Sequence, residues 1–168
     1  MNLAWLNELS KAEAEVVFRD CCGSRSWART MAEARPFPML ENLFEQASGH
    51  WWSLTSEDWL EAFAAHPKIG SSKPAPSREE RAAKWSAGEQ SGVDAADKVV
   101  KTELAQANRL YEEKFGFIFI VCATGKRADE MLEACRARLG NSIETEMQIA
   151  AEEQRKITEI RLTKLLER

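Results

Sequence analysis

The chain has 168 residues, a length that favours one domain and suffices to bury a core without a disulfide or a structural metal. Apolar residues make up 44% and charged residues 30% of the sequence, and six Trp with seven Phe supply core material, which excludes an intrinsically disordered chain. The net charge of −4 comes from signs mixed along the chain, without the Lys/Arg-rich stripe of a nucleic-acid-binding protein, so we expect no nucleic-acid partner.

The uninterrupted apolar stretches are far shorter than the roughly 20 residues that cross a bilayer, so we expect no membrane partner. The N-terminal sequence MNLAWLNELSKAEAE is not typical of a secretory signal, and the C-terminal LLER is not a peroxisomal address. None of the four cysteines lies in a CxxC pair and the chain has only two histidines, a poor set for a zinc site. These features predict a cytoplasmic protein with free thiols and no bound metal.

Helical periodicity runs through almost the whole chain. In the N-terminal half it predicts four helices, over residues 10–22, 24–34, 39–50 and 57–65. The first opens with the capping box Ser10–Glu13 and ends near Gly23. The fourth stops at His66, because a residue that precedes a proline is disfavoured in the helical conformation.

In the C-terminal half the pattern predicts four further helices, over residues 77–87, 94–114, 124–139 and from 142 for about 25 residues. Their expected caps are Ser77, Asp94, Thr124 and Ser142. The uncharged run 115–122 could be a buried strand or a connector between helices, and no partner strand is evident in the sequence. The prediction is an all-α, single-domain bundle of about eight helices over residues 1–168.

Arg161 breaks the apolar stripe of the last predicted helix. In one interpretation its stem packs while its charged head reaches water or a surface acid. In the other, the guanidinium points into a cavity and holds an anionic or carbonyl-rich ligand. The stripe comprises Ile143, Met147, Ala150, Gln154, Ile157, Arg161 and Leu165.

His66 and Glu89 are the other candidate functional residues. His66 either caps a helix C-terminus, where the macrodipole favours the imidazolium, or is a positioned acid or base. Glu89 is either a solvated loop acid or, with Ser86 and Gln90, part of a polar pocket wall. We interpret His50 as structural. One His, one Glu and one inward Arg suit a cofactor-free acid/base enzyme that acts on a small anion.

Four longer motifs carry a more specific signal: HPKIG (66–70), WSAGEQSGV (85–93), YEEKFGFIFIVCATGK (111–126) and EQRKITEIRL (153–162). In this order and spacing, over nearly the whole chain, they closely resemble the family of OHCU decarboxylases (2-oxo-4-hydroxy-4-carboxy-5-ureidoimidazoline decarboxylases). The resemblance implies an all-α, homodimeric enzyme of uric acid degradation that converts OHCU to (S)-allantoin and CO2 without a cofactor.

The resemblance also implies a set of site residues. The implied catalytic residues are His66, Glu89 and Arg161, and Glu89 is the acid paired with His66. The substrate carries a ring C=N that can accept the electron pair released with CO2, so the protein has to orient the carboxylate, stabilise charge and deliver a proton. The implied substrate-binding residues are Pro67, Ser86, Glu89, Gln90, Ile118, Phe119, Ile120, Val121, Cys122, Ala123 and Arg161.

Two other functions remain open at this point. One is a non-catalytic helical interaction module, which predicts an exposed apolar groove and no clustering of His66, Glu89 and Arg161. The other is a lyase or hydrolase that acts on a related ureide. The tryptophans are candidates for the dimer interface: Trp5, Trp27, Trp51, Trp52, Trp59 and Trp85.

Overall fold

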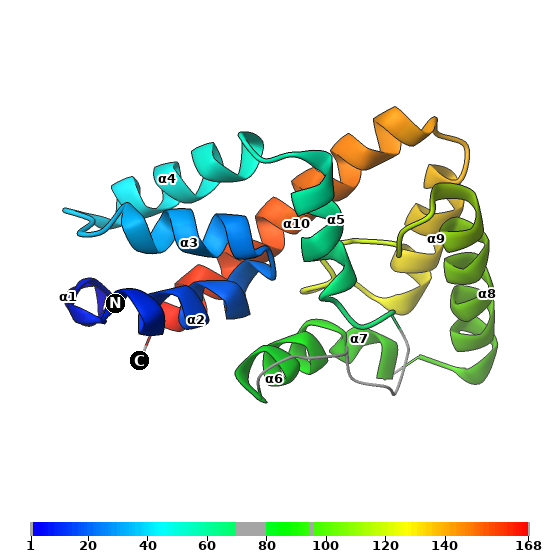
Figure 1. Cartoon of the computed structure of the whole chain (residues 1–168). Helices are drawn as coiled ribbons and strands as arrows, with labels where there is room; N and C mark the ends of the chain where they lie inside the picture. The colour runs from blue at the N-terminus through cyan, green and yellow to red at the C-terminus, as the bar shows by residue number, and fades with distance from the viewer. Residues whose placement is uncertain (1, 70–79, 95, 168) are drawn as a thin grey trace. The chain divides into compact units, whose positions relative to one another are not determined.

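The computed structural model describes residues 2–69, 80–94 and 96–167. Within these ranges it has ten α-helices and no strand (Figure 1), which confirms the all-α prediction. Eight of the described helices are nine residues or longer, in line with the expected number. The helices are α1 (Leu3–Glu8), α2 (Lys11–Cys22), α3 (Arg25–Glu33), α4 (Leu40–Trp52), α5 (Ser56–Ala64), α6 (Glu80–Glu89), α7 (Ser91–Asp94), α8 (Lys98–Phe115), α9 (Ala128–Arg138) and α10 (Ile143–Leu166).

The chain forms two compact units. The first comprises Met1–Ala62 and Arg155–Arg168, and the second comprises Phe63–Gln154. The longest helix, α10, contributes its N-terminal half to the second unit and its C-terminal half to the first. Most of the residues expected to form the site lie in the second unit.

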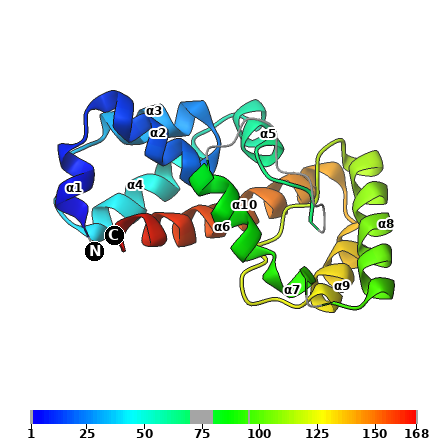
Figure 2. The ribbon, with the colours of Figure 1, turned by 90° about the horizontal axis from the view of Figure 1, so that it is seen from below.

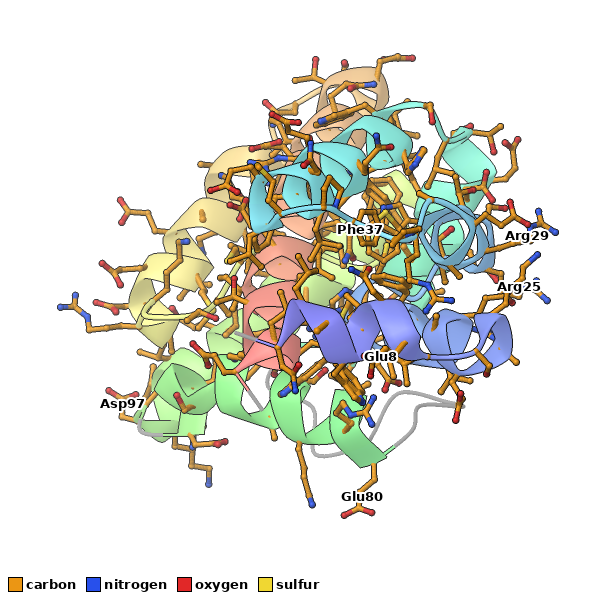
Figure 3. The ribbon with its side chains drawn as sticks, turned by 90° about the vertical axis from the view of Figure 1, so that its left-hand side faces the viewer. Glu8, Arg25, Arg29, Phe37, Glu80 and Asp97 are labelled. Atoms are coloured by element: carbon orange, nitrogen blue, oxygen red, sulfur yellow. The ribbon has the colours of Figure 1, made fainter. Side chains whose placement is uncertain are left out.

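In the first unit, α2 packs on α3 and α3 on α4 (Figure 1). Trp27 is fully buried at their centre and its indole N–H donates to a backbone carbonyl of α4. The ring of Phe18 meets the rings of Trp27 and Phe37 edge-on. Figure 3 shows Phe37 among the side chains of this unit, whereas Arg25 and Arg29 point outward. Aromatic packing therefore forms this core.

Burial divides the tryptophans that were candidates for an interface. Trp27, Trp51 and Trp59 are at most 7% exposed and belong to the core, so the interface prediction is wrong for these three. Trp52 is 41% exposed and stays a candidate. The four cysteines form no disulfide and are buried, where they pack as small apolar side chains.

Local capping explains the helix boundaries that the sequence predicts correctly. The Ser10 side chain accepts from the Glu13 N–H, and the Glu13 carboxylate accepts in turn from the Ser10 N–H. Gly23 ends α2 in the left-handed conformation, with φ of 89°. The Ser142 hydroxyl accepts from the Thr145 N–H at the start of α10.

Two predicted caps are wrong. Asp94 ends the short helix α7, and Asp97 caps α8 by accepting from the Val100 N–H at 3.0 Å. Thr124 lies in a turn with Gly125 at φ of 78°, so α9 begins later, at Ala128. The predicted cap Ser77 lies outside the described residues.

The second unit pairs α8 with α9, which lie side by side in Figure 2. Tyr111 of α8 is fully buried, and its ring contacts those of Phe115, Phe117 and Phe119. Gly116 ends α8 with φ of 78° and turns the chain into residues 117–123, which form neither helix nor strand. Of the two interpretations of the uncharged run, the buried connector is therefore correct.

Candidate active site

His66 follows the last turn of α5 and is held by a residue far away in the sequence. Its Nε2 lies 2.6 Å from Oε1 of Gln154, which is fully buried on α10. An amide oxygen only accepts hydrogen bonds, so His66 donates the Nε2 proton. The imidazole thus has a specific side-chain partner in addition to its place at a helix end.

Glu89 is the last residue of α6, not a loop residue. The helix continues through Gly88, because a glycine inside a helix weakens it without ending it. Glu89 is only 8% exposed, and Ser86, one turn earlier on the same face, is 4% exposed. The solvated-acid interpretation is therefore wrong. Gln90 follows, half-buried, and its N–H donates to the Ser86 carbonyl.

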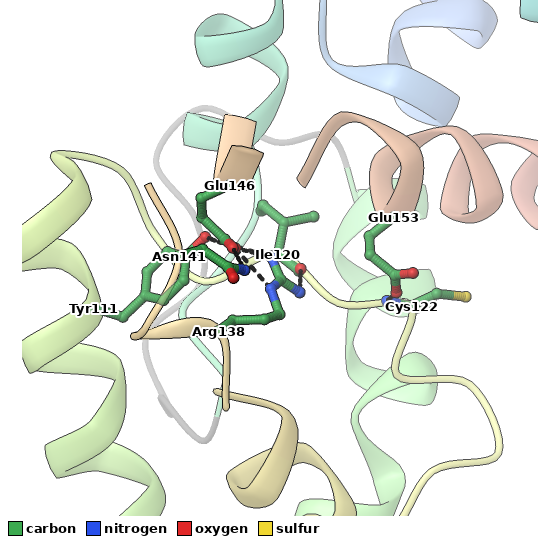
Figure 4. Close-up of polar contacts among 7 residues, drawn as sticks. All are labelled: Tyr111, Ile120, Cys122, Arg138, Asn141, Glu146 and Glu153. Carbon is green, nitrogen blue, oxygen red and sulfur yellow. Dashed lines mark hydrogen bonds and ion pairs between the residues drawn. The ribbon is translucent and has the colours of Figure 1, made fainter. Parts of the chain in front are cut away.

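The connector contains most of the expected substrate-binding residues. Ile118 is half-buried, and each of the residues 119–123 is at most 7% exposed. The Cys122 N–H donates to the Glu153 carboxylate at 2.7 Å, and the Cys122 carbonyl accepts from the Lys126 ammonium at 2.8 Å. Figure 4 shows Glu153 of α10 beside Cys122. Side chains thus supply the hydrogen bonds that a neighbouring strand would otherwise make.

A second anchor holds the connector two residues earlier. The Arg138 guanidinium donates to the Ile120 carbonyl at 2.8 Å and lies over the Phe119 ring, with 4.6 Å between its Cζ and the ring centroid. It also pairs with the fully buried Glu146 at 2.5 Å. Tyr111 donates its hydroxyl proton to the same carboxylate (Figure 4). Burial and this hydrogen bond raise the pKa of Tyr111 far above its ordinary value.

Electrostatics connect Glu89 with the connector. Burial raises the pKa of the Cys122 thiol, and the negative charges of Glu153 and Glu89 raise it further, while Lys126 lowers it. The carboxylates of Glu153 and Glu89 therefore both lie near Cys122. Glu153 is adjacent to Gln154, the partner of His66. The second unit thus brings together the regions around residues 66, 86–90, 118–123 and 153–154.

The remaining expected site residues are Pro67 and Arg161. Pro67 is half-buried directly after His66. Arg161 lies in the first unit on α10 and is fully buried, so its head does not reach water, which was one of the two possibilities within the simpler interpretation. Ile143, expected on the same inward stripe, is 49% exposed because it is the first residue of α10.

The glycine at position 92 lets α7 approach the turn after the connector. A Cβ atom built on Gly92 would lie 2.2 Å from the carbonyl oxygen of Lys126, far inside van der Waals contact. Only glycine fits there, three residues after Glu89 and four after Gly88. Gly92 therefore permits the close packing of the α6–α7 region against the turn after the connector.

Several residues of this region were not predicted from the sequence. Gln154 interrupts an apolar stripe just as Arg161 does, so its polarity was a usable signal. Glu153 stood in a motif without an assigned role. Nothing in the local sequence marks Arg138 and Glu146 as a buried ion pair, because their pairing depends on how α9 and α10 pack.

Three further findings concern other classes of site. In the described ranges, no three His, Cys, Asp or Glu side chains are grouped so that they could hold a metal ion. No helix among the described residues is long and apolar enough to cross a membrane. The first unit has a cavity of about 80 Å³ beside Trp51 and the Arg155–Glu159 ion pair, and none of the expected site residues lines it.

Comparison with known proteins identifies the family. The model of the OHCU decarboxylase family matches residues 7–163. The chain belongs to the OHCU decarboxylase family. It is 43% identical to the uric acid degradation bifunctional protein TTL of Arabidopsis thaliana over 146 residues, which cover 86% of this chain and 45% of that protein. The chain spans less than half the length of the first curated relatives that it matches.

Other members of the family match over more of their own length. The 2-oxo-4-hydroxy-4-carboxy-5-ureidoimidazoline decarboxylase of Haloferax volcanii is 24% identical, and the match covers 96% of this chain and 94% of that protein. The crystal structure of an OHCU decarboxylase in the presence of (S)-allantoin superposes with a TM-score of 0.79 at 38% identity. That match covers 91% of this chain and 99% of the crystallised chain.

Proposed function

We propose that the chain decarboxylates OHCU to (S)-allantoin and CO2 in uric acid degradation, without a cofactor. The relative from Haloferax volcanii bears the name of this decarboxylase. The structural relative at 38% identity is an OHCU decarboxylase crystallised in the presence of (S)-allantoin. The observation that carries the proposal for this chain is the cluster in the second unit. In it, His66 contacts Gln154, the adjacent Glu153 holds Cys122, and the charge of Glu89 acts on the same thiol.

The substrate needs little from the protein besides orientation and proton transfer. The bond from the ring carbon to the carboxylate breaks, CO2 leaves, and the electron pair forms a double bond to the neighbouring carbon. The C=N electrons of that neighbour move to its nitrogen, which takes up a proton. The hydroxyl-bearing carbon then becomes a carbonyl as the hydroxyl loses its proton, and the neighbouring carbon gains one. Delivery of that last proton to one face sets the handedness of the product.

We assign these tasks to named residues. His66 contacts the hydroxyl and transfers the proton, since an imidazole changes charge near neutral pH. Glu89 orients the imidazole or the N–H groups of the ring. Arg161 anchors ring or ureido carbonyls, for which the guanidinium offers several donors.

The connector contributes backbone groups to substrate binding. The N–H of Cys122 and the carbonyls of Ile120, Cys122 and Ala123 already bond within the protein, so we assign the substrate contacts to the other backbone groups of residues 118–123. Their burial gives the ligand a poorly hydrated environment, in which fixed hydrogen-bond donors act more strongly than in water. Pro67, Ser86 and Gln90 complete the proposed set.

We further propose that residues 1–168 work as one OHCU decarboxylase domain in a cytoplasmic homodimer. Four buried cysteines that form no disulfide fit a reducing compartment. The exposed Trp52 on α4 and the half-buried Trp5 and Trp85 are the candidate aromatic residues for an interface between copies. Light scattering during size-exclusion chromatography should give twice the mass of the 19.0 kDa chain, and a monomer at all concentrations would contradict the dimer.

The test of the function is the handedness of the product. Urate is oxidised enzymatically in the presence of the purified chain, and the circular dichroism of allantoin is followed over time. We expect (S)-allantoin to accumulate faster than it forms spontaneously. A racemic product at the spontaneous rate would contradict the decarboxylase. Turnover of a related ureide instead would favour the alternative lyase or hydrolase, and no turnover of either would favour an interaction module.

A further inference from the structure

Gln154 occupies a position where an apolar residue would be expected. It lies on α10 between Ala150 and Ile157, which are at most 5% exposed, and it is itself fully buried. Burying an amide costs free energy unless its polar atoms make hydrogen bonds. The Gln154 Oε1 accepts a hydrogen bond from the Nε2 of His66 at 2.6 Å, and the two residues are 88 positions apart in the sequence.

We propose that Gln154 is a positioning residue that fixes the orientation and the protonation equilibrium of the His66 imidazole. The inference rests on the proposed function and adds a residue to it. With the Nε2 proton donated to an amide oxygen, the proton that His66 gains or loses is the one on Nδ1. The ring plane is also held, so that Nδ1 keeps one direction during turnover.

The location of Gln154 suits this task better than a purely structural one. Gln154 lies on a helix, which is more rigid than the segment after α5 that carries His66. Gln154 therefore orients the imidazole, which gains and loses the proton. The adjacent residue Glu153 holds the Cys122 N–H. One turn of α10 therefore contacts both the imidazole and the connector.

A charge at position 154 would act on His66 among several ionisable groups. The structure places Glu153 of α10, Glu89 of α6 and Lys126 around Cys122 in this part of the unit. Lys68, two residues after His66, pairs with Glu112 of α8. None of these groups changes in variants of residue 154, so a shift can be assigned to the substituted side chain.

Two variants of opposite effect test the proposal. Gln154→Met keeps the approximate shape of the side chain but removes the acceptor, so the imidazolium loses a favourable hydrogen bond and its pKa falls. Gln154→Glu places a carboxylate beside the Nε2 proton, which favours the imidazolium and raises the pKa of His66 by about 1 unit or more. The matched controls are Gln148→Met and Gln148→Glu, since Gln148 is exposed on the same helix and its charge is screened by water.

The pKa of His66 is measured by NMR titration of the imidazole protons. The chain has only two histidines, so the variant His50→Gln identifies the signal of His66. We expect the pKa to rise in the order Met, Gln, Glu at position 154 and to stay constant in both controls. This measurement needs no substrate and is independent of the proposed function.

Kinetics provide the second measurement. We expect Gln154→Met to lower kcat by about 10²-fold with a smaller change in KM, because the imidazole is misplaced while the substrate still binds. In Gln154→Glu, the part of the pH–rate profile that depends on His66 should move to higher pH. The displacement should equal the change in the pKa of His66 that NMR titration measures. An unchanged pKa in both variants, with kcat within about twofold of wild type, would overturn the inference while leaving the function intact. Failure of wild-type turnover would overturn the function alone, and the pKa order would still decide the inference.

Discussion

A methyl group at position 92 would lie 2.2 Å from the carbonyl oxygen of Lys126, and that oxygen belongs to the backbone. We predict that Gly92→Ala lowers stability by about 1–3 kcal/mol, because α7 has to move away from the turn after the connector. The displacement would carry Glu89 with it and lower kcat/KM by about 10-fold or more. Urea unfolding and the allantoin assay measure the two effects.

Gly88 provides the matched control, one residue before Glu89 on α6. A Cβ atom at Gly88 meets nothing within 4 Å. Gly88→Ala should therefore be neutral or stabilise the helix by up to about 1 kcal/mol, with normal turnover. Equal effects of the two substitutions would contradict the close-packing explanation.

At the level of elements, the connector between α8 and α9 depends on side chains of α9 and α10. Arg138 holds the Ile120 carbonyl and pairs with Glu146, whose side chain is 0% exposed. We predict that Arg138→Met costs about 3–5 kcal/mol of stability, because it leaves a buried carboxylate without its cation. Denaturant unfolding measures the change.

The same helix offers a control for this prediction. Arg136 pairs with Glu103, but both side chains are largely exposed, at 57% and 43%. Arg136→Met should cost only about 0–1 kcal/mol. If both substitutions cost the same, Arg138 does not hold a buried network in solution.

The elements themselves were largely predictable from the sequence, because helix periodicity and caps are local signals. Ser10 with Glu13 located the start of α2, and Pro67 located the end of α5. The cap of α8 was misplaced because Asp94 and Asp97 are equally good caps, and only packing decides between them. The end of α6 lies later than predicted, because the helix continues through Gly88 to Glu89.

The candidate site was predictable where a polar residue interrupts an apolar pattern or a motif matches the family. His66, Glu89 and the connector were found in that way. The contacts that join them could not be predicted, since the hydrogen bonds that His66 donates to Gln154 and Cys122 donates to Glu153 span 88 and 31 positions. Such pairings depend on tertiary packing, for which a single sequence has no local signal.

For the whole molecule, the buried thiols predict how stability changes in alkaline solution. Burial raises the pKa of Cys135 from 9.0 to about 11. Between these values the folded chain keeps a proton that the unfolded chain loses, so stability is greatest below about pH 9 and falls as the pH rises toward 11. The thiol contributes a slope of at most about 1.4 kcal/mol per pH unit.

Urea unfolding at several pH values tests this prediction, with Cys135→Ala as the comparison. The wild type should lose stability more steeply than the variant between about pH 9 and 11. Parallel curves would show that the Cys135 thiol does not titrate differently in the folded and unfolded chains.

The account as a whole depends on His66 as the group that transfers the proton during decarboxylation. The most direct test compares His66→Gln with the wild type in the circular dichroism assay for (S)-allantoin, with unfolding curves confirming that both chains are folded. We predict that the variant loses well over about 10²-fold in kcat. Near-normal turnover to the same enantiomer in His66→Gln would contradict the account.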